Sequence, residues 1–367
     1  MSALSLLMDK SDMPTDQPSV PGHSQPLAPT GRLSRLDKYL PLWIGLAMVF
    51  GLLLGRLVPN LKQFFDAVRV GSVSLPIALG LLWMMYPVLA KVQYEKLHES
   101  FRDWKLFGVS LALNWIIGPL LMFGLAWLFL AHYQGYREGV IMVGLARCIA
   151  MVLIWNMLAG GDPEKAAILV ALNSIFQILM YSPYAYLFIG SAQVTMWEIA
   201  RSVFVFLGIP LIAGMLTRFY FLRKRGRQWF ESVLIPKLGP TAIFGLLFTI
   251  VVMFAMQGDK ILAEPLDVLL IAAPLIAYFL IMFAVSFVGS WFLRFPYPQT
   301  VSLSFTAASN NFELAIAVAI ATYGIQSDAA LATVVGPLIE VPVLLLLVYV
   351  ALWLRPIMWK KRGHTAL

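Results

Sequence analysis

The residues best suited to chemistry in this sequence lie inside long apolar runs. Cys148 is the chain's single cysteine and follows Arg147. A later run carries Asn310 and Asn311, three and two residues before Glu313. A thiolate is a soft nucleophile that binds soft atoms, whereas a carboxylate exchanges protons and pairs with cations. Ionisable side chains in apolar segments are costly, so these positions predict a binding or proton-exchange site.

The apolar runs predict the elements that must position these side chains. Ten segments stand out, at residues 40–58, 70–90, 106–130, 139–159, 165–189, 199–221, 235–256, 266–293, 299–323 and 329–354. Hydrophobic residues make up 60% of the chain, which exceeds what a soluble domain needs for its core. The sequence therefore predicts an all-α polytopic protein of the lipid bilayer with ten transmembrane helices.

Charge and composition exclude several classes of function. A single cysteine rules out an intrachain disulfide framework, and the four histidines fall outside the apolar segments, so we expect no metal site and no cofactor. The net charge of +8 is carried by loops between the segments, so it indicates orientation rather than nucleic-acid binding. An intramembrane enzyme is not expected either, because no nucleophile and base pair is evident.

The distribution of basic residues predicts the orientation. With the N-terminus inside, 19 of the 27 Lys and Arg residues fall on the cytoplasmic side and six on the other. Both termini are therefore expected in the cytoplasm and the helices in the cell (inner) membrane. The proline-rich residues 1–34 are predicted to form a disordered cytoplasmic tail, and residues 357–367 a second cytoplasmic tail.

An internal repeat appears when the sequence is compared with itself at an offset of 163 residues. Gly45 then meets Gly208, Cys148 meets Asn311 and Gln177 meets Glu340. Five segments in each half would insert the two copies with opposite orientation. Residues 35–190 and 191–356 are thus predicted to form two inverted five-helix repeats, with discontinuous crossing helices 4 and 9.

The polar residues of these helices are expected to meet near the membrane midplane. Cys148 lies roughly 15 Å from the start of its predicted helix, Asn311 and Glu313 roughly 18 to 21 Å, and Glu340 about 17 Å. Asn310 and Asn311 are poor residues for a helix interior, so the ninth helix is expected to unwind there. The half-helix ends could then address a ligand.

Other residues have two interpretations each. Arg147 is either a counter-ion for Glu313 or a group that activates the neighbouring thiol. Asn173 and Gln177, one turn apart, either support the site or bond a neighbouring helix. The small residues of the segment 51–55 are compatible with a homodimer face, but close packing within the chain is the stronger expectation.

Four stretches resemble the arsenite permeases of the Acr type, which belong to the bile acid/arsenite/riboflavin transporter group. They are residues 146–156 (ARCIAMVLIWN), 169–177 (LVALNSIFQ), 305–318 (FTAASNNFELAIAV) and 335–342 (VGPLIEVP). The resemblance covers nearly everything from about residue 36 to 355.

The resemblance implies a secondary transporter that exports arsenite, and in some members antimonite, by proton antiport. It assigns transport roles to the cysteine of the fourth helix and the glutamate of the ninth, here Cys148 and Glu313. Asn310 and Asn311 would hydrogen-bond neutral arsenous acid beside the thiol. Glu313, with Glu340, would carry the coupling proton, and Arg147, Asn173 and Gln177 would support the site.

Two other functions stay open from the residues alone. A sodium-coupled organic-anion carrier on the same fold would use the Asn, Glu and Gln side chains as a cation site. A membrane receptor or sensor could also have ten helices with buried polar contacts, although it would not require an inverted repeat with polar residues at the crossing.

Overall fold

The computed structural model describes residues 39–58, 61, 69–70, 73–96, 103–149, 151–190, 195–263 and 265–359. The predicted N-terminal tail, residues 1–34, lies outside this part of the chain. The predicted C-terminal tail begins inside the last helix, which ends at Trp359, and its remainder also lies outside the described residues.

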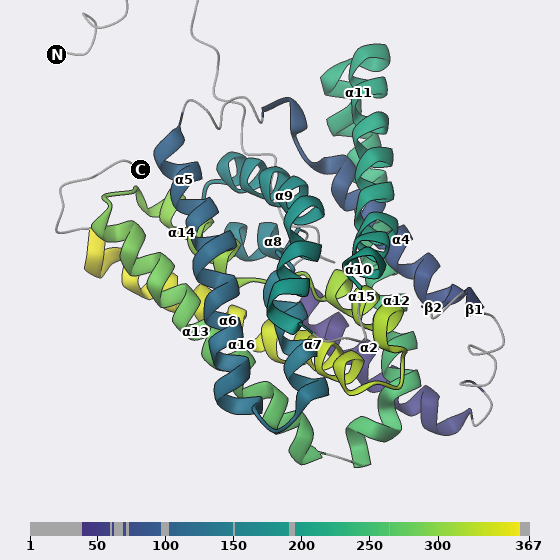
Figure 1. Ribbon diagram of the computed structural model, residues 1–367. Coiled ribbons are helices and arrows are strands. Elements are labelled where there is room, and N and C mark those ends of the chain that lie inside the picture. Colours follow the sequence, from purple (N-terminus) through teal and green to yellow (C-terminus); the bar gives the residue numbers. More distant parts are fainter. Residues whose placement is uncertain are drawn as a thin grey trace, which may run out of the picture.

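The described chain is helical apart from one short ribbon (Figure 1). The first half contains α2 (Leu40–Leu57), β1 (Arg69–Val70), β2 (Val73–Ser74), α4 (Leu75–Lys91), α5 (Trp104–Ala112), η2 (Leu113–Ile117), α6 (Gly118–Leu130), α7 (Gln134–Leu145), α8 (Met151–Leu158) and α9 (Pro163–Ile189). The second half contains α10 (Met196–Val203), η3 (Phe204–Gly208), α11 (Ile209–Trp229), η4 (Phe230–Leu234), α12 (Ile235–Ala263), α13 (Pro265–Phe292), α14 (Tyr297–Ala308), α15 (Phe312–Tyr323) and α16 (Asp328–Trp359).

Several element boundaries recur at the offset found in the sequence. Adding 163 to the bounds of α7, 134 and 145, gives 297 and 308, which are the bounds of α14. The same addition places α8 and the start of α9 within two residues of α15 and the start of α16. The two halves therefore break and resume their helices at matching places.

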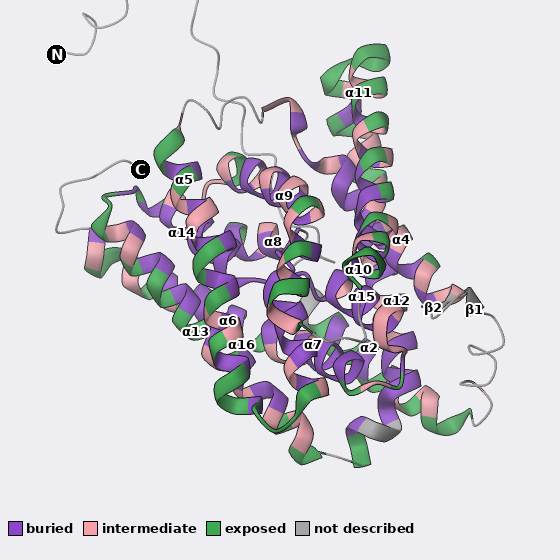
Figure 2. Ribbon diagram, viewed as in Figure 1, coloured by how far each residue is buried: buried purple, intermediate pink, exposed green. Residues whose placement is uncertain are grey.

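The helices carry the surface expected of a membrane protein. Five helical stretches are long and apolar enough to span a bilayer, and three shorter apolar helices accompany them among the described residues. Figure 2 marks the exposed positions along the helices, and large apolar residues are among them: Leu42, Leu46, Val49 and Leu53 of α2 are each at least half exposed. This spacing of four, three and four residues forms one helix face, which suits contact with lipid.

The helices pack in two groups. One group joins α2, α4, α11 and α12, and the other joins α6, α7, α13, α14 and α16. Gly51 and Gly55 allow the close contact of α2 with α12, because a Cβ at Gly55 would lie 2.2 Å from the carbonyl oxygen of Ala255. The expectation that segment 51–55 packs within the chain is confirmed.

Three of the prolines lie just after π-helical turns. The turns η2, η3 and η4 each end two residues before a proline, namely Pro119, Pro210 and Pro236. Proline lacks the N–H of the normal helical bond, and its ring clashes with the carbonyl one turn earlier. A wider turn just before each proline relieves this conflict and lets the helix continue.

One predicted boundary is wrong. The second apolar segment was expected to be helical from residue 70, but Arg69–Val70 and Val73–Ser74 pair as an antiparallel ribbon and α4 begins only at Leu75. Valine favours extended backbone, and the Gly-Ser pair between the two valines is typical of a turn. Hydrophobicity alone did not distinguish this short ribbon from the helix that follows it.

An ion pair between buried Arg218 and partly exposed Glu95 attaches the turn after α4 to α11. Arg218, 1% exposed, donates from Nε to Glu95 Oε2 at 2.8 Å and from Nη2 to Glu95 Oε1, and from Nη1 to the carbonyl oxygen of Lys91 at 3.3 Å. Burial alone would raise the pKa of Glu95, but the hydrogen bonds and charge of Arg218 outweigh burial and leave this pKa below its usual range. The pair therefore persists at neutral pH, and its stabilisation is lost only as pH falls through the lowered pKa.

We expect Glu95→Gln to reduce the stability of the folded protein by about 1.5–3 kcal/mol, because Arg218 loses a charged hydrogen-bond partner while staying buried. Thermal unfolding of the purified protein in detergent measures this change. Glu231→Gln is the matched control, since that carboxylate pairs with Arg227 on the exposed surface. Equal unfolding temperatures for the two variants would show that the pair of Glu95 and Arg218 does not stabilise the fold.

Candidate functional site

The candidate site forms where two broken helices meet. The helix of the first half stops at Leu145 and resumes at Met151, and that of the second half stops at Ala308 and resumes at Phe312. Asn311 ends the second break by accepting a bond from Leu314 N at 3.0 Å, which is the usual role of an N-cap asparagine. The predicted interruptions of the fourth and ninth segments are present in the structure.

The two breaks bind each other through their backbones. Arg147 and Asn310 pair as an antiparallel bridge, and the Asn311 amide donates to the Ala146 carbonyl at 2.9 Å. The Asn310 side chain adds bonds from Nδ2 to the carbonyl oxygens of Val143 at 2.8 Å and Ala146 at 3.1 Å. Backbone N–H and C=O groups that lose their helical hydrogen bonds at the breaks thus find partners within the protein. An apolar membrane interior requires this, because it offers no water as a partner.

The two halves support the crossing in the same way. The Arg147 amide donates to Gln177 Oε1, and the Asn310 amide donates to Glu340 Oε1 at 3.1 Å. Residues 147 and 310, like residues 177 and 340, differ by 163. The structure therefore brings Gln177 and Glu340 to equivalent places, with an amide in one half and a carboxyl group in the other.

Arg147 is buried within the crossing and bonds neutral groups. Its Nη1 donates to Tyr278 Oη at 2.8 Å and to the Ala307 carbonyl at 3.4 Å. A Cβ at Gly118 would lie 2.9 Å from Nη1, so a glycine is needed beside the guanidinium. Among the described residues Arg147 forms no ion pair, and its interpretation as a counter-ion of Glu313 is wrong. A sequence does not show which helix packs beside an arginine.

Cys148 is a free, buried thiol in the first of the two breaks. It is 3% exposed, and it directly follows Arg147, which pairs with Asn310 of the second break. The predicted group of Cys148, Asn310, Asn311 and Glu313 therefore gathers at one place in the fold.

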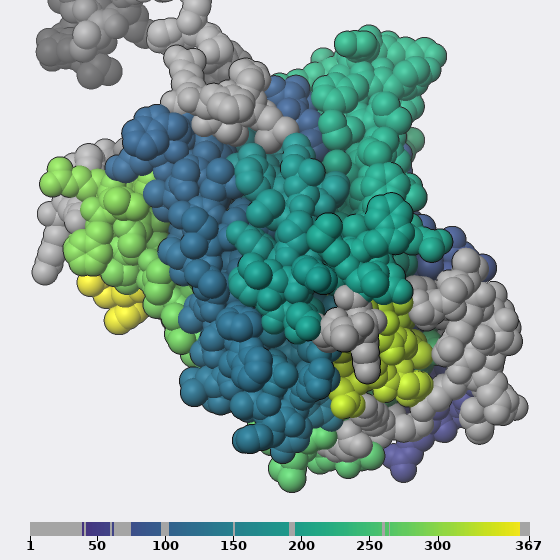
Figure 3. Space-filling model, viewed as in Figure 1, coloured from purple at the N-terminus to yellow at the C-terminus, as the bar shows by residue number. Residues whose placement is uncertain are grey.

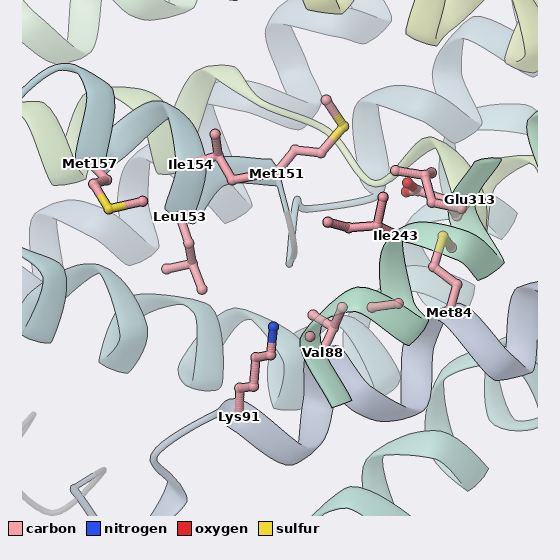
Figure 4. A pocket seen from close by; sticks show the side chains of 12 residues that line it. Met84, Val88, Lys91, Met151, Leu153, Ile154, Met157, Ile243 and Glu313 are labelled. Carbon is pink, nitrogen blue, oxygen red and sulfur yellow. The ribbon is translucent and has the colours of Figure 1, made fainter. Parts of the chain in front are cut away.

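A cavity of about 220 Å³ reaches Glu313 (Figure 4). Its lining comes from α4, α8, α12 and α15, and consists of Met84, Val88, Lys91, Met151, Leu153, Ile154, Met157, Gly239, Ala242, Ile243, Leu246 and Glu313. A second space of about 20 Å³, enough for roughly one water molecule, is lined by both Glu313 and Glu340. Glu313 thus stands between the larger cavity and Glu340.

Several polar atoms at the crossing have no hydrogen-bond partner among the described residues. They are Arg147 Nε and Nη2, Gln177 Nε2, Asn310 Oδ1, Asn311 Nδ2 and Glu340 Oε2. Leaving such an atom unsatisfied in a buried place costs about 1–3 kcal/mol. This concentration of free donors and acceptors indicates a place that receives a polar solute.

Asn173 does not join this group. Its Oδ1 accepts a bond from Trp115 Nε1 at 3.1 Å, so its contact is with a neighbouring helix.

Sequence reasoning also missed three kinds of residue. Tyr278 had no signal in an apolar run, the lining methionines resembled ordinary core residues, and Lys91 counted only as an orientation signal.

The described residues contain no group of three or more His, Cys, Asp and Glu side chains that could hold a metal ion. The structure has apolar helices around two paired breaks, and its larger cavity ends at a carboxyl group. These features are typical of an integral membrane transporter.

Comparison with known proteins agrees with this class. Residues 78–264 match the model of the Sodium Bile acid symporter family. The chain is 51% identical to the arsenical-resistance protein Acr3 of Corynebacterium glutamicum, over 91% of this chain and 93% of that protein. It is 37% identical to an uncharacterized transporter of Synechocystis, over 87% and 88% of the two chains. It is 34% identical to the Acr3 protein of Alkaliphilus metalliredigens, over 86% and 92%.

The chain therefore belongs to the sodium bile acid symporter family, together with the Acr3 arsenical-resistance proteins. It is a transporter and not an enzyme, and the resemblance found in residues 146–156 and 305–318 is confirmed.

Proposed function

We propose that the protein exports trivalent arsenite, and also antimonite, from the cytoplasm in exchange for protons. The observation that carries this proposal is the position of Cys148, a single buried thiol at the crossing where Arg147 pairs with Asn310 and amide atoms stay unpaired. A thiol is a soft donor for trivalent arsenic. One thiol would hold the substrate weakly enough to release it, which a three-cysteine site would not.

The surrounding groups suit a neutral trihydroxide. Gln177 and Asn311 present a free donor and Asn310 a free acceptor, so hydroxyl groups that both donate and accept would find partners. In this proposal Asn310, Asn311 and Cys148 bind the substrate, and Glu313 contributes both a hydrogen bond and the coupling proton. Glu340 is the second proton carrier, since it shares a small space with Glu313.

The family name favours a second candidate, a sodium-coupled organic-anion carrier. The cavity size speaks against it. A pocket for a drug-sized organic ligand usually measures about 300–1,000 Å³, whereas this cavity measures about 220 Å³. The dimensions favour a small solute.

The matching element boundaries support a ten-helix arrangement of two inverted repeats. In this arrangement α7 with α8, and α14 with α15, are the discontinuous helices of the two halves, and each half holds five spans. Both termini and the basic end of α11 would then face the cytoplasm, in keeping with the charge distribution. Figure 3 shows this end of α11 projecting beyond the neighbouring helices.

The proposed orientation predicts opposite accessibility for two introduced cysteines. In a Cys148→Ser background, Arg225→Cys should react with an impermeant thiol reagent only after cells are opened, whereas His132→Cys should react in intact cells. Arg225 lies near the exposed end of α11, and His132 lies in the turn between α6 and α7. Labelling of position 225 from outside intact cells would contradict the orientation.

Arsenite uptake into everted membrane vesicles tests the function itself. We expect uptake when a pH gradient is imposed, with the vesicle interior acidic, and background uptake with a sodium gradient or with no gradient. Vesicles without the protein are the control. If arsenite uptake follows only the sodium gradient, the coupling ion is sodium and not the proton. If no uptake occurs under any gradient, arsenite is not the substrate.

A further inference from the structure

Two spaces meet at Glu313, the larger cavity of about 220 Å³ and a smaller inner space of about 20 Å³. Three residues line both of them, namely Met151, Leu246 and Glu313. Residues that line two spaces lie between them, so these three side chains form a partition. Glu340 lines the inner space but not the larger cavity, and therefore lies behind this partition.

The order of residues along α12 shows where the partition lies. Ile243 lines the larger cavity alone, Leu246 lines both spaces, and Ile250 lines the inner space alone. Because these residues are three and four positions apart, they share one helix face, which rises about 10 Å from the first to the last. Leu246 thus marks the boundary between the two spaces on α12.

Met151 closes the partition from the other side. It is the first residue of α8, and the later α8 residues that line the larger cavity do not line the inner space. Figure 4 shows Met151 toward the Glu313 end of the larger cavity, with Met157 at the opposite end. Leu246 is 8% exposed and Met151 is 7% exposed. The partition therefore consists of buried side chains from α12 and from the crossing helices α8 and α15.

Close packing fixes this part of α12 against α4. A Cβ at Gly245 would lie 3.0 Å from backbone atoms of Met84, and a Cβ at Gly80 would lie 2.6 Å from Thr249 Oγ1. These contacts fall directly before Leu246 and three residues after it. The α12 backbone is thus held on both sides of the partition, in a close-packed region where side chains have little freedom to move.

The partition separates two carboxyl groups that differ in what can reach them. The inner space holds roughly one water molecule, which is too little room for a solute with three hydroxyl groups. Glu340 Oε1 accepts the Asn310 amide bond, whereas Oε2 has no partner among the described residues and could bond a polar solute. Apolar side chains at a constriction oppose the passage of water and polar solutes. Leu246 and Met151 are placed to supply this barrier.

We propose that Leu246, together with Met151, is a hydrophobic gate that lets solutes in the larger cavity reach Glu313 and keeps them from Glu340. The inference rests on the proposed function, in which the two glutamates carry the coupling protons. It adds that they do not exchange protons with the same space. Leu246 acts through this separation and not as a ligand of the substrate.

Thiol labelling tests the gate without arsenite. In a Cys148→Ser background, a single cysteine is introduced at Ile243, in the larger cavity, or at Ile250, in the inner space. The purified protein is treated with methyl methanethiosulfonate, and the modification is followed by mass spectrometry. We expect Ile243→Cys to react several-fold faster than Ile250→Cys. Adding Leu246→Ala should raise the rate at position 250 several-fold, because the two spaces then join.

Three further variants separate the gate from general loosening. Ile243→Ala truncates the same helix face but lines only the larger cavity, so labelling at position 250 should stay slow. Leu246→Met conserves volume and should keep the gate closed. Met151→Ala opens the partition from α8 in case Leu246→Ala does not assemble. Fast labelling at position 250 with Leu246 in place would overturn the proposal, as would equal rates for the opened gate and Ile243→Ala.

Transport supplies the second readout. With the gate open, Glu340 exchanges protons with the larger cavity directly, so everted vesicles with Leu246→Ala should lose an imposed pH gradient faster without arsenite and accumulate less arsenite. Leu262→Ala is the control, since it makes the same truncation at an exposed position of α12. If the parent protein carries no arsenite, the proposed function fails, whereas the labelling rates still decide whether Leu246 is a gate. Accumulation at the parent level by Leu246→Ala would overturn its role in coupling.

Discussion

Cys148→Ser should reach the membrane at the parent level and lose arsenite export. Serine is close to cysteine in size but lacks the soft sulfur donor, so the packing cost should be about 1 kcal/mol or less. No disulfide is lost, because Cys148 is the single cysteine of the chain. Export is measured as uptake of arsenite into everted vesicles under a pH gradient, and assembly as the amount of protein in the membrane.

Met151→Leu is the matched control for this experiment. Met151 lines both spaces that Glu313 joins, so the substitution removes a thioether from the same region and keeps the thiol. It should retain most of the export, since leucine and methionine have similar volumes. Export by Cys148→Ser at the parent rate would make Cys148 a packing residue and would favour the organic-anion carrier.

Glu313→Gln should abolish uptake driven by a pH gradient. The amide has nearly the shape of the carboxyl group but cannot take up or release a proton, so the variant should bind substrate without coupling its movement to the gradient. Glu313 is partly exposed to the larger cavity and also lines the space shared with Glu340, which makes it the accessible carboxyl group of the site.

Two companion variants separate coupling from general damage. Glu231→Gln changes an exposed carboxylate outside the site and should transport like the parent protein. Glu340→Gln keeps the oxygen that accepts the Asn310 amide bond, so the crossing should remain intact while one ionisable group is lost. Accumulation of arsenite against a gradient by Glu313→Gln would assign the coupling proton to Glu340 or to another group.

The helices and their breaks were largely predictable from the sequence. Long apolar runs set the spans, and the pair Asn310 and Asn311 marked the second break because asparagine is a poor residue for a helix interior. The alignment of Gln177 with Glu340 also appeared in the sequence offset. Its physical basis is now visible, since each side chain accepts the bond of a backbone amide freed at the crossing.

The partners of the polar residues were not predictable in the same way. One of the two interpretations of Arg147 placed it beside a carboxylate. It instead bonds Tyr278, because the packing of α13 decides which side chain reaches the guanidinium. Lys91 was indistinguishable from other basic residues at helix ends until α12 and α8 placed it on a cavity wall. Sequence patterns follow one helix at a time, whereas these contacts depend on how three or four helices pack.

The most direct test of the account is whether arsenite protects Cys148 from alkylation. The parent protein in membranes is treated with a thiol reagent in the presence or absence of arsenite, and modification of the single cysteine is followed by mass spectrometry. We predict that arsenite slows alkylation in a concentration-dependent way, and that an equal concentration of phosphate has no effect. An alkylation rate that stays unchanged at arsenite concentrations that saturate transport would contradict binding at Cys148.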